Sequence, residues 1–308
     1  MRMPDPSGLV HIVDDVDELV EPPTQPILVH ALEGFLDAGN AGRLVTDELS
    51  GRAGSRVVAS FDVDQLYDYR GRRPGLTFLE DHYEAYAAPR LTVRLVLDDA
   101  DLPFLLLSGP EPDYRWEGFA LAVRSLVQRF DVALVLGLGA VPMAVPHTRP
   151  LMLTSHAATP GLLREPNVWK GRIRVPASAQ AVLELRMGEW GHPAMGLVAH
   201  VPHYVAQADF PGAGVTLVEA VCRHTGLQLS TEGLSTAAAA RLTDIATQVE
   251  ASEEVTQAVA ALEAQYDAFT RGTGSSLLAD NAPLPSAEEL GAEFERFLAR
   301  LDRRDEES

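Results

Sequence analysis

The segment that most constrains the fold runs from Phe130 to Pro150 and reads FDVALVLGLGAVPMAVPHTRP. Residues 131–136 form a short apolar run rich in Val and Leu, which predicts a strand buried on both faces. We expect the small residues Gly137 to Ala140 to end this strand, because the prolines that follow forbid a long helix. Ligands of open α/β sheets bind beyond the carboxyl ends of parallel strands. The segment from His147 to Arg149 therefore marks a candidate site.

Other apolar segments predict strands that alternate with helices over residues 27–225. This order favours an α/β fold with a mostly parallel sheet between layers of helices. The expected strands are 10–13, 27–32, 56–61, 91–97, 104–107, 131–136, 151–154 and 195–200, and the expected helices are 41–49, 116–130, 178–189 and 214–224. Gly51 is placed to stop the first helix, and Ser178 to cap the third.

Composition changes after residue 230, which divides the chain into two expected parts. Residues 1–230 form the α/β core domain, whose first 26 residues are acidic and interrupted by prolines. Residues 231–308 form a C-terminal helical region with helical periodicity over 235–271, a Gly/Ser loop at 272–276 and a last helix from Ser286 to about Leu301. This region contains 16 acidic and 6 basic residues.

The charge and apolar pattern of the chain exclude several classes of protein. A formal charge of −19 argues against binding to nucleic acid or to an anionic membrane surface. No apolar run approaches the ~20 residues of a membrane span, and the N-terminus lacks the pattern of a secretory signal. A single cysteine, Cys222, excludes an internal disulfide. We expect a cytoplasmic protein.

Standard nucleotide and hydrolase motifs are missing. Gly137-Leu138-Gly139 resembles the start of a dinucleotide fingerprint, but Pro142 occupies the position of the third glycine, and a proline-rich loop replaces the helix that would bind pyrophosphate. The sequence contains neither a GxxxxGK[ST] loop nor a Gly-x-Ser-x-Gly elbow. We interpret the glycines as allowing the chain to leave the strand in a tight turn. We expect no cofactor.

His200 and His203 are spaced as HxxH, which invites a comparison with metal sites. Positions i and i+3 of a strand face opposite ways, and Pro202 excludes a helix, so the two side chains do not converge without tertiary help. His147 and His156 would also need tertiary proximity to bind a metal. We expect no metal site.

Four side chains follow predicted strands and are candidates for catalysis: Glu33, Asp37, His147 and His200. If the strands are parallel neighbours, these groups gather at the carboxyl edge of the sheet, where a carboxylate–histidine pair could transfer protons. The alternative, which we favour, is that Asp37 caps the helix at 41–49, Glu33 binds a loop backbone and the histidines brace turns.

A loop from Asp64 to Phe78 carries several tyrosines and arginines. Tyr69 and Arg70 suit a protein interface, because Tyr and Arg are frequent anchors there. The alternative is a solvated loop.

Three segments together resemble the proteasome assembly chaperone 2 family: Glu33–Ala41 (EGFLDAGNA), Gly137–Ala140 with Pro146–Pro150 (GLGA and PHTRP), and His200–Tyr204 (HVPHY). The element Asp68-Tyr69-Arg70 before Arg73-Pro74 is similar to the bacterial branch of the family, and the added helices resemble its actinobacterial members. The resemblance spans about residues 25–230.

This resemblance implies a three-layer α/β/α core like that of the phosphorylase/hydrolase fold, in a homo-oligomer for which a trimer is the expected form. Eukaryotic members help to assemble proteasome α-rings, so proteasome subunits or another protein assembly are candidate partners. Chaperones that dock on the proteasome carry a hydrophobic–Tyr–X tail, whereas this chain ends Glu306-Glu307-Ser308. Docking by that route is not expected.

The motifs supply the candidate residues for binding a ligand or a partner: Gly34, Asp37, Gly39, Gly137, Gly139, His147, Arg149, His203, Tyr204, Tyr69 and Arg70. Our leading hypothesis is a non-enzymatic protein-binding or assembly factor. The alternative is a small-molecule hydrolase or a nucleoside-phosphorylase-like enzyme that uses the loops 33–40, 137–149 and 200–204. A deep pocket with Glu33 or Asp37 bonded to a histidine would favour the enzyme.

Overall fold

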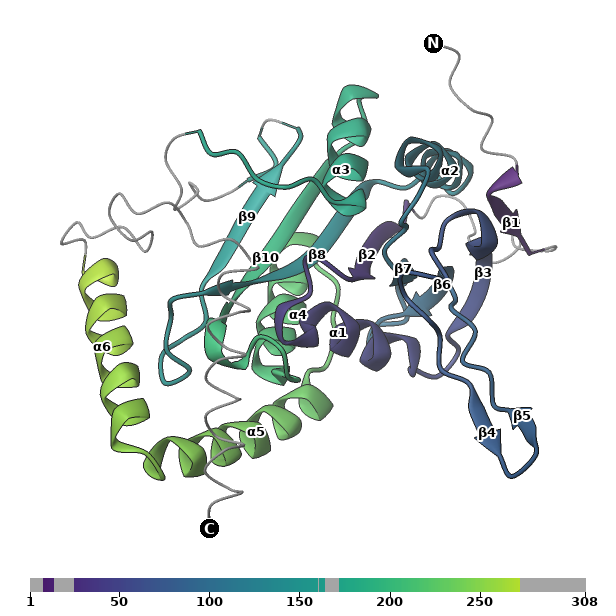
Figure 1. Cartoon of the computed structure of the whole chain (residues 1–308). Coiled ribbons are helices and arrows are strands. Elements are labelled where there is room, and N and C mark those ends of the chain that lie inside the picture. The colour runs from purple at the N-terminus through teal and green to yellow at the C-terminus, as the bar shows by residue number, and fades with distance from the viewer. Residues whose placement is uncertain (1–7, 14–24, 160, 164–171, 272–308) are drawn as a thin grey trace.

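The computed structural model describes residues 8–13, 25–159, 161–163 and 172–271. Its centre is an eight-stranded sheet in the order β1-β3-β6-β7-β2-β8-β10-β9 (Figure 1). The strands are β1 (Val10–Ile12), β2 (Ile27–Glu33), β3 (Arg56–Phe61), β6 (Thr92–Leu97), β7 (Pro103–Pro110), β8 (Leu134–Met143), β9 (Leu153–Ala157) and β10 (Ala194–Pro202). Strands β7, β2, β8 and β10 are parallel neighbours, and β3 runs in the same direction, whereas β1, β6 and β9 are antiparallel.

Helices cover both faces of this sheet, as the alternation of elements predicted. On one face, α2 (Trp116–Arg129) and α3 (Ala179–Glu189) bury residues such as Phe119 and Leu183. On the other face, α1 (Ala41–Ser50) and α4 (Pro211–Thr225) bury residues such as Val45 and Leu217. Two separate apolar cores result, one on each side of the sheet. The three-layer α/β/α architecture is confirmed.

Strand β8 lies between β2 and β10, as expected for a central strand, but its predicted end is wrong. The strand continues through Gly137 and Gly139 to Met143. These glycines are therefore not a strand exit. An added Cβ at Gly137 would lie 2.9 Å from Cε1 of His30, so the glycine lets the imidazole pack on the strand. Pro142 is tolerated because β8 pairs with β2 only as far as Gly137.

The segment expected to be a loop, 64–78, leads into a hairpin made of β4 (Thr77–Leu79) and β5 (His82–Glu84), which the sequence analysis did not predict. Figure 1 shows this hairpin projecting away from the body of the molecule. All six of its strand residues are exposed. The main sheet does not continue into it.

Two long helices, α5 (Glu232–Glu250) and α6 (Glu253–Thr270), confirm the helical pattern predicted for residues 235–271. Leu234 and Ile245 of α5 are buried in the apolar core that also contains residues of α1 and α4. No helix among the described residues is apolar and long enough to span a membrane. The Gly/Ser loop at 272–276 and the helix expected from Ser286 lie outside the described residues.

Candidate functional site

The three motif segments meet at one edge of the sheet because they follow strands that are neighbours. Strands β2, β8 and β10 are adjacent and parallel, and they end at Glu33, Met143 and Pro202. The residue pair Asp37 and Ala140 forms an isolated parallel bridge that extends the contact between the first two segments. The three motif segments therefore lie together at the carboxyl edge of the sheet.

The side chain of Asp37 binds the start of helix α1, as predicted, although Asn40 occupies the N-cap position itself. Its Oδ1 atom accepts a hydrogen bond of 2.6 Å from the backbone N–H of Gly42. Burial raises the pKa of Asp37 to about 6, although the backbone hydrogen bonds from Gly42 and Arg43 act in the opposite direction. Partial desolvation and the nearby carboxylate of Asp47 also raise the pKa of Glu33, although the residue as a whole is exposed at the end of β2. A proton donor or acceptor that titrates near neutrality thus lies at this edge.

Gly39 joins the first motif to the segment that follows the third. Its φ of 66° lies in the left-handed region, and an added Cβ would stand 2.8 Å from Cβ of Phe210. Its N–H donates to the carbonyl of Ala206 at 2.7 Å, and its carbonyl accepts from the N–H of Phe210 at 2.8 Å. The glycine is needed for this close approach of two backbones, which fixes the geometry of the edge.

His147 is held by Tyr204 of the third motif. The backbone N–H of His147 donates to the tyrosine hydroxyl at 2.8 Å, and its Nδ1 atom lies 2.7 Å from the same oxygen. Burial raises the pKa of Tyr204 to about 12, so the hydroxyl keeps its proton and can donate it to Nδ1. Burial lowers the pKa of His147. His203 is exposed and packs its ring against Tyr204.

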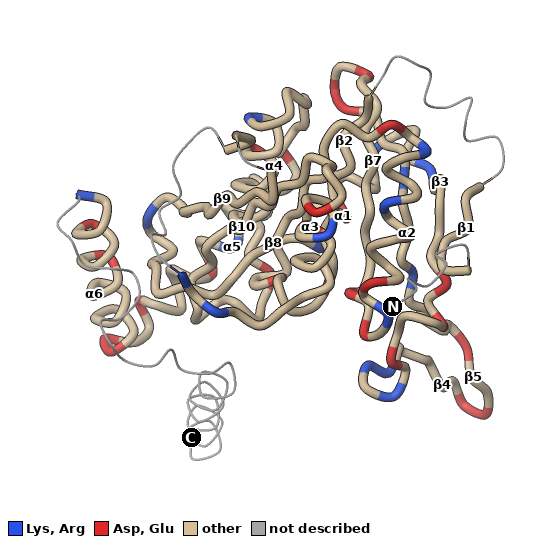
Figure 2. The backbone as a smooth tube through the Cα atoms, turned by 90° about the horizontal axis from the view of Figure 1, so that it is seen from above, with Lys and Arg blue, Asp and Glu red and all other residues tan. Residues whose placement is uncertain are grey.

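Arg149 binds helix α6 rather than an open crevice. Its Nε and Nη2 atoms donate to the two carboxylate oxygens of Asp267 at 2.9 and 3.0 Å, and Nη1 donates to Glu263 at 3.2 Å. Thr148 also donates to Glu263, and Tyr266 donates to the carbonyl of Pro150 at 2.8 Å. The second motif therefore contacts helix α6 through Thr148, Arg149 and Pro150, and Figure 2 shows acidic positions along α6 in red.

His200 does not join the other candidate groups. It is buried, its Nε2 atom lies 2.7 Å from the Thr154 hydroxyl, and burial lowers its pKa to about 4. His203, three residues later, is exposed, so the HxxH pair does not converge. Within the described residues, neither Glu33 nor Asp37 hydrogen-bonds a histidine, and no cluster of potential metal ligands forms.

The sequence analysis missed three polar residues beside this edge. Glu111 accepts the backbone N–H of Ala179 at 2.7 Å and so binds the start of α3, and Gln180 donates to the carbonyl of Leu138 at 2.9 Å. His30 is buried next to Gln180 and Gly137, and burial lowers its pKa to about 4. None of the three belongs to a motif. Only Glu111 could have been found from the sequence, because it directly follows a strand, as the other candidate residues do.

Tyr69 and Arg70 lie on the loop between β3 and the hairpin. The rings of Tyr67 and Tyr69 are in edge contact at 5.1 Å, and the guanidinium of Arg72 lies 4.5 Å from the Tyr67 ring centre. Arg70 is exposed. Figure 2 shows the basic positions of this loop in blue beside β4.

A family model described as the PAC2 family matches residues 31–249, which contain all three motif segments. The chain belongs to the PAC2 family. No match was found among curated proteins.

Several solved structures of other proteins resemble the chain. A Mycobacterium tuberculosis protein of unknown function, Rv2714, is 44% identical with a TM-score of 0.83, and the match covers 89% of this chain and 93% of that one. A Corynebacterium glutamicum protein of unknown function is 35% identical with a TM-score of 0.81, covering 86% and 99%. The M. tuberculosis proteasome-assembly chaperone homologue Rv2125 is 25% identical with a TM-score of 0.69, covering 76% and 99%.

Proposed function

We propose that this PAC2 protein is a cytoplasmic, non-enzymatic protein-binding factor that helps a multi-subunit assembly to form. Its partners are proteasome subunits or another protein assembly, and it acts as a homo-oligomer, with three copies as the expected number. The similarity to a protein described as a proteasome-assembly chaperone homologue supports the choice of a protein partner.

The observation that carries this proposal is the apolar surface of the β4–β5 hairpin. Phe78 is 59% exposed and Tyr83 is 70% exposed, and the two rings contact each other across the hairpin. Leu76 and Leu79 are exposed beside them. A two-stranded hairpin has little stability alone, and clustered exposed apolar residues mark protein interaction sites. We assign this hairpin to association with another polypeptide.

The geometry of the motif edge supports the same proposal. The side chains of Arg149 and His147, which would have to bind a substrate, are engaged by α6 and by Tyr204. Phe35 is 52% exposed in the first motif and offers a further apolar contact for a partner. In this proposal, the candidate partner-binding residues of the motifs hold the loop that exposes Phe35 and do not react with a substrate.

Light scattering of the purified protein tests the association. We expect the wild type to have a mass that is a multiple of the 33.3 kDa of one chain. Replacing Phe78→Thr and Tyr83→Thr keeps the strand propensity of the hairpin but removes its aromatic surface, and should lower the mass. Leu185→Gln, at an exposed leucine of α3, is the matched control and should not. A wild type that is monomeric at all concentrations would contradict the homo-oligomer.

The alternative function is a small-molecule hydrolase or a nucleoside-phosphorylase-like enzyme at the same edge. The observation that favours it is the pKa of Asp37, which burial raises to about 6 and which suits proton transfer near neutrality. Turnover of a substrate that is abolished by Asp37→Asn, with unchanged folding, would establish this alternative and reject the binding function.

A further inference from the structure

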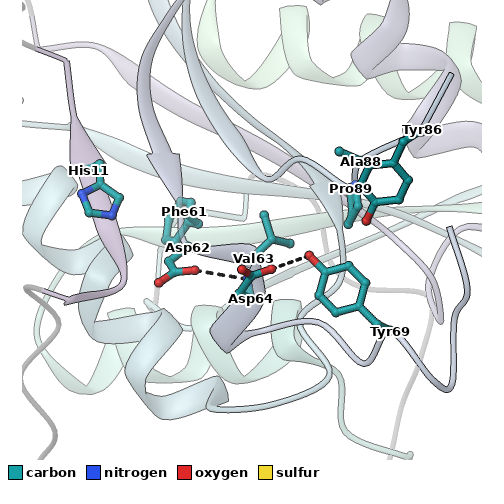
Figure 3. Close-up of a pocket in the computed structure, with 9 residues that line it drawn as sticks. All are labelled: His11, Phe61, Asp62, Val63, Asp64, Tyr69, Tyr86, Ala88 and Pro89. Atoms are coloured by element: carbon teal, nitrogen blue, oxygen red, sulfur yellow. Dashed lines mark hydrogen bonds between the residues drawn. The ribbon is translucent and has the colours of Figure 1, made fainter. Parts of the chain in front are cut away.

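A hollow of about 500 Å³ opens at the carboxyl end of β3, separated from β2 by β6 and β7. Figure 3 shows its arrangement: the turn after β3 carries Asp62 and Asp64, His11 of β1 lies on one side, and the rings of Tyr69 and Tyr86 lie on the other. This volume is typical of pockets that bind small groups, about 300–1,000 Å³. The hollow is distinct from the motif edge.

The two carboxylates of the hollow differ in how they are bound. Both oxygens of Asp62 are engaged, one by the N–H of Asp64 and the other by the Gln65 amide at 2.7 Å. Oδ1 of Asp64 accepts the Tyr69 hydroxyl at 2.6 Å. Oδ2 of Asp64 accepts no hydrogen bond and forms no ion pair within the described residues. This carboxylate is therefore oriented by Tyr69 and keeps an oxygen for a ligand.

Two carboxylates, Asp62 and Asp64, line the hollow. The hydrogen bond to Asp64 raises the pKa of Tyr69 to about 12, because the carboxylate opposes a second negative charge. Carboxylate oxygens form strong, charge-assisted hydrogen bonds with cationic donors, and tyrosine rings attract cations to their faces. Together these groups favour a cation with a flat apolar surface.

The neighbouring tyrosine already binds such a group from the chain itself. The guanidinium of Arg72 lies over Tyr67 and donates to Asp113 at 2.6 Å. Tyr69, which contacts Tyr67, has the same combination of a tyrosine ring and a carboxylate, Asp64, but no arginine of the described part of the chain pairs with that carboxylate. The structure thus contains one filled tyrosine–carboxylate site for a guanidinium beside an open one.

We propose that this hollow binds an arginine side chain of a partner polypeptide, with the guanidinium on Asp64 and against the tyrosine rings. This inference rests on the proposed protein-binding function and specifies the chemistry of the partner. Arginine suits the site better than lysine, because its planar guanidinium can stack on an aromatic ring and can donate two parallel hydrogen bonds to a carboxylate. The chain's charge of −19 attracts a basic segment of a partner.

Calorimetric titration of the full chain with acetyl-Ala-Arg-Ala-amide tests the proposal. The matched peptide with citrulline keeps the planar shape without the charge and should bind at least tenfold more weakly. Asp64→Asn keeps an acceptor for Tyr69 and should also weaken the arginine peptide about tenfold. Tyr86→Thr, at an exposed ring, should weaken it several-fold. Asp244→Asn, at an exposed aspartate of α5, is the control and should bind like the wild type.

Three results would overturn the proposal. The first is equal binding of the arginine and citrulline peptides, and the second is an Asp64→Asn variant that binds like the wild type. The third is a lower oligomeric mass for Asp64→Asn, which would assign the hollow to a second copy. If arginine binding is confirmed while the hairpin variant still associates normally, only the role of the hairpin fails, so the two proposals are tested separately.

Discussion

The hydroxyl of Tyr204 accepts the backbone N–H of His147 at 2.8 Å across 57 residues of sequence. The same oxygen also lies 2.7 Å from Nδ1 of the histidine. Through these two contacts, Tyr204 of the third motif holds His147 of the second. The motif edge is thus a set of loops that bind one another.

Replacing Tyr204→Phe should destabilise the protein by about 1–3 kcal/mol, because a half-buried N–H loses its acceptor. Urea denaturation measures this loss. Tyr83→Phe, at a hydroxyl of the exposed hairpin, is the control and should change the free energy of unfolding by less than about 0.5 kcal/mol. Equal stability of the two variants would show that the contact contributes nothing.

Replacing Arg149→Gln should release α6 from the second motif, because the ion pairs with Asp267 and Glu263 are lost. We expect faster hydrogen exchange over residues 253–270, measured by mass spectrometry, and a similar effect of high salt on the wild type. Arg223→Gln, an exposed arginine of α4, is the control. If exchange in α6 is unchanged in Arg149→Gln, the apolar contacts of the helix alone are sufficient.

Replacing Gly137→Ala should cost about 1–3 kcal/mol, because the new methyl group would stand 2.9 Å from the His30 ring and 3.2 Å from the Gln180 amide in a packed core. Gly51→Ala, where the added Cβ would lie 3.4 Å from the nearest atom, is the control. Thermal unfolding of both variants measures the difference. An unaffected Gly137→Ala would mean that the imidazole has room to move.

Acid should destabilise the protein through His30. Its pKa is about 4 in the folded chain against an ordinary 6.5, so between these values the unfolded chain binds the proton and the folded chain does not. Stability therefore falls as the pH drops from about 6.5 to 4, by about 3 kcal/mol for this group.

His30→Gln isolates that contribution. The variant should show a smaller loss of stability over the same pH range than the wild type in urea titrations. Asp37 titrates with the opposite sign, because its pKa is raised and the folded chain gains a proton as the pH falls. Asp37 is present in both proteins, so its contribution cancels when the pH profile of the variant is subtracted from that of the wild type. Parallel pH profiles would contradict the assignment to His30.

Local patterns predicted most of the framework. The apolar run at 27–32 and the cap at Asp37 correctly gave β2 and the start of α1, because strand burial and helix capping depend on neighbouring residues. Ser178 was likewise confirmed as a cap, since its hydroxyl accepts the N–H of Ala181 at 3.0 Å.

Errors arose where distant residues decide the structure. The strand predicted to end at 136 runs on to Met143 because β10, about sixty residues later in the chain, pairs with it over that whole length. The partners of Arg149 lie 114 and 118 residues away, although the spacing of Glu263 and Asp267 places both carboxylates on one face of a helix. The hairpin lacks the Asn-Gly or Asp-Gly turn that normally signals one.

The most direct test of the proposed function compares the proteins that co-purify with tagged variants from the native cells. If the protein associates through the hairpin and not by catalysis, the wild type and Asp37→Asn should both capture a stoichiometric protein assembly. The Phe78→Thr, Tyr83→Thr variant should lose it, and Leu185→Gln should keep it. Capture that survives in the hairpin variant, or a wild type that elutes without any stoichiometric partner, would contradict this account.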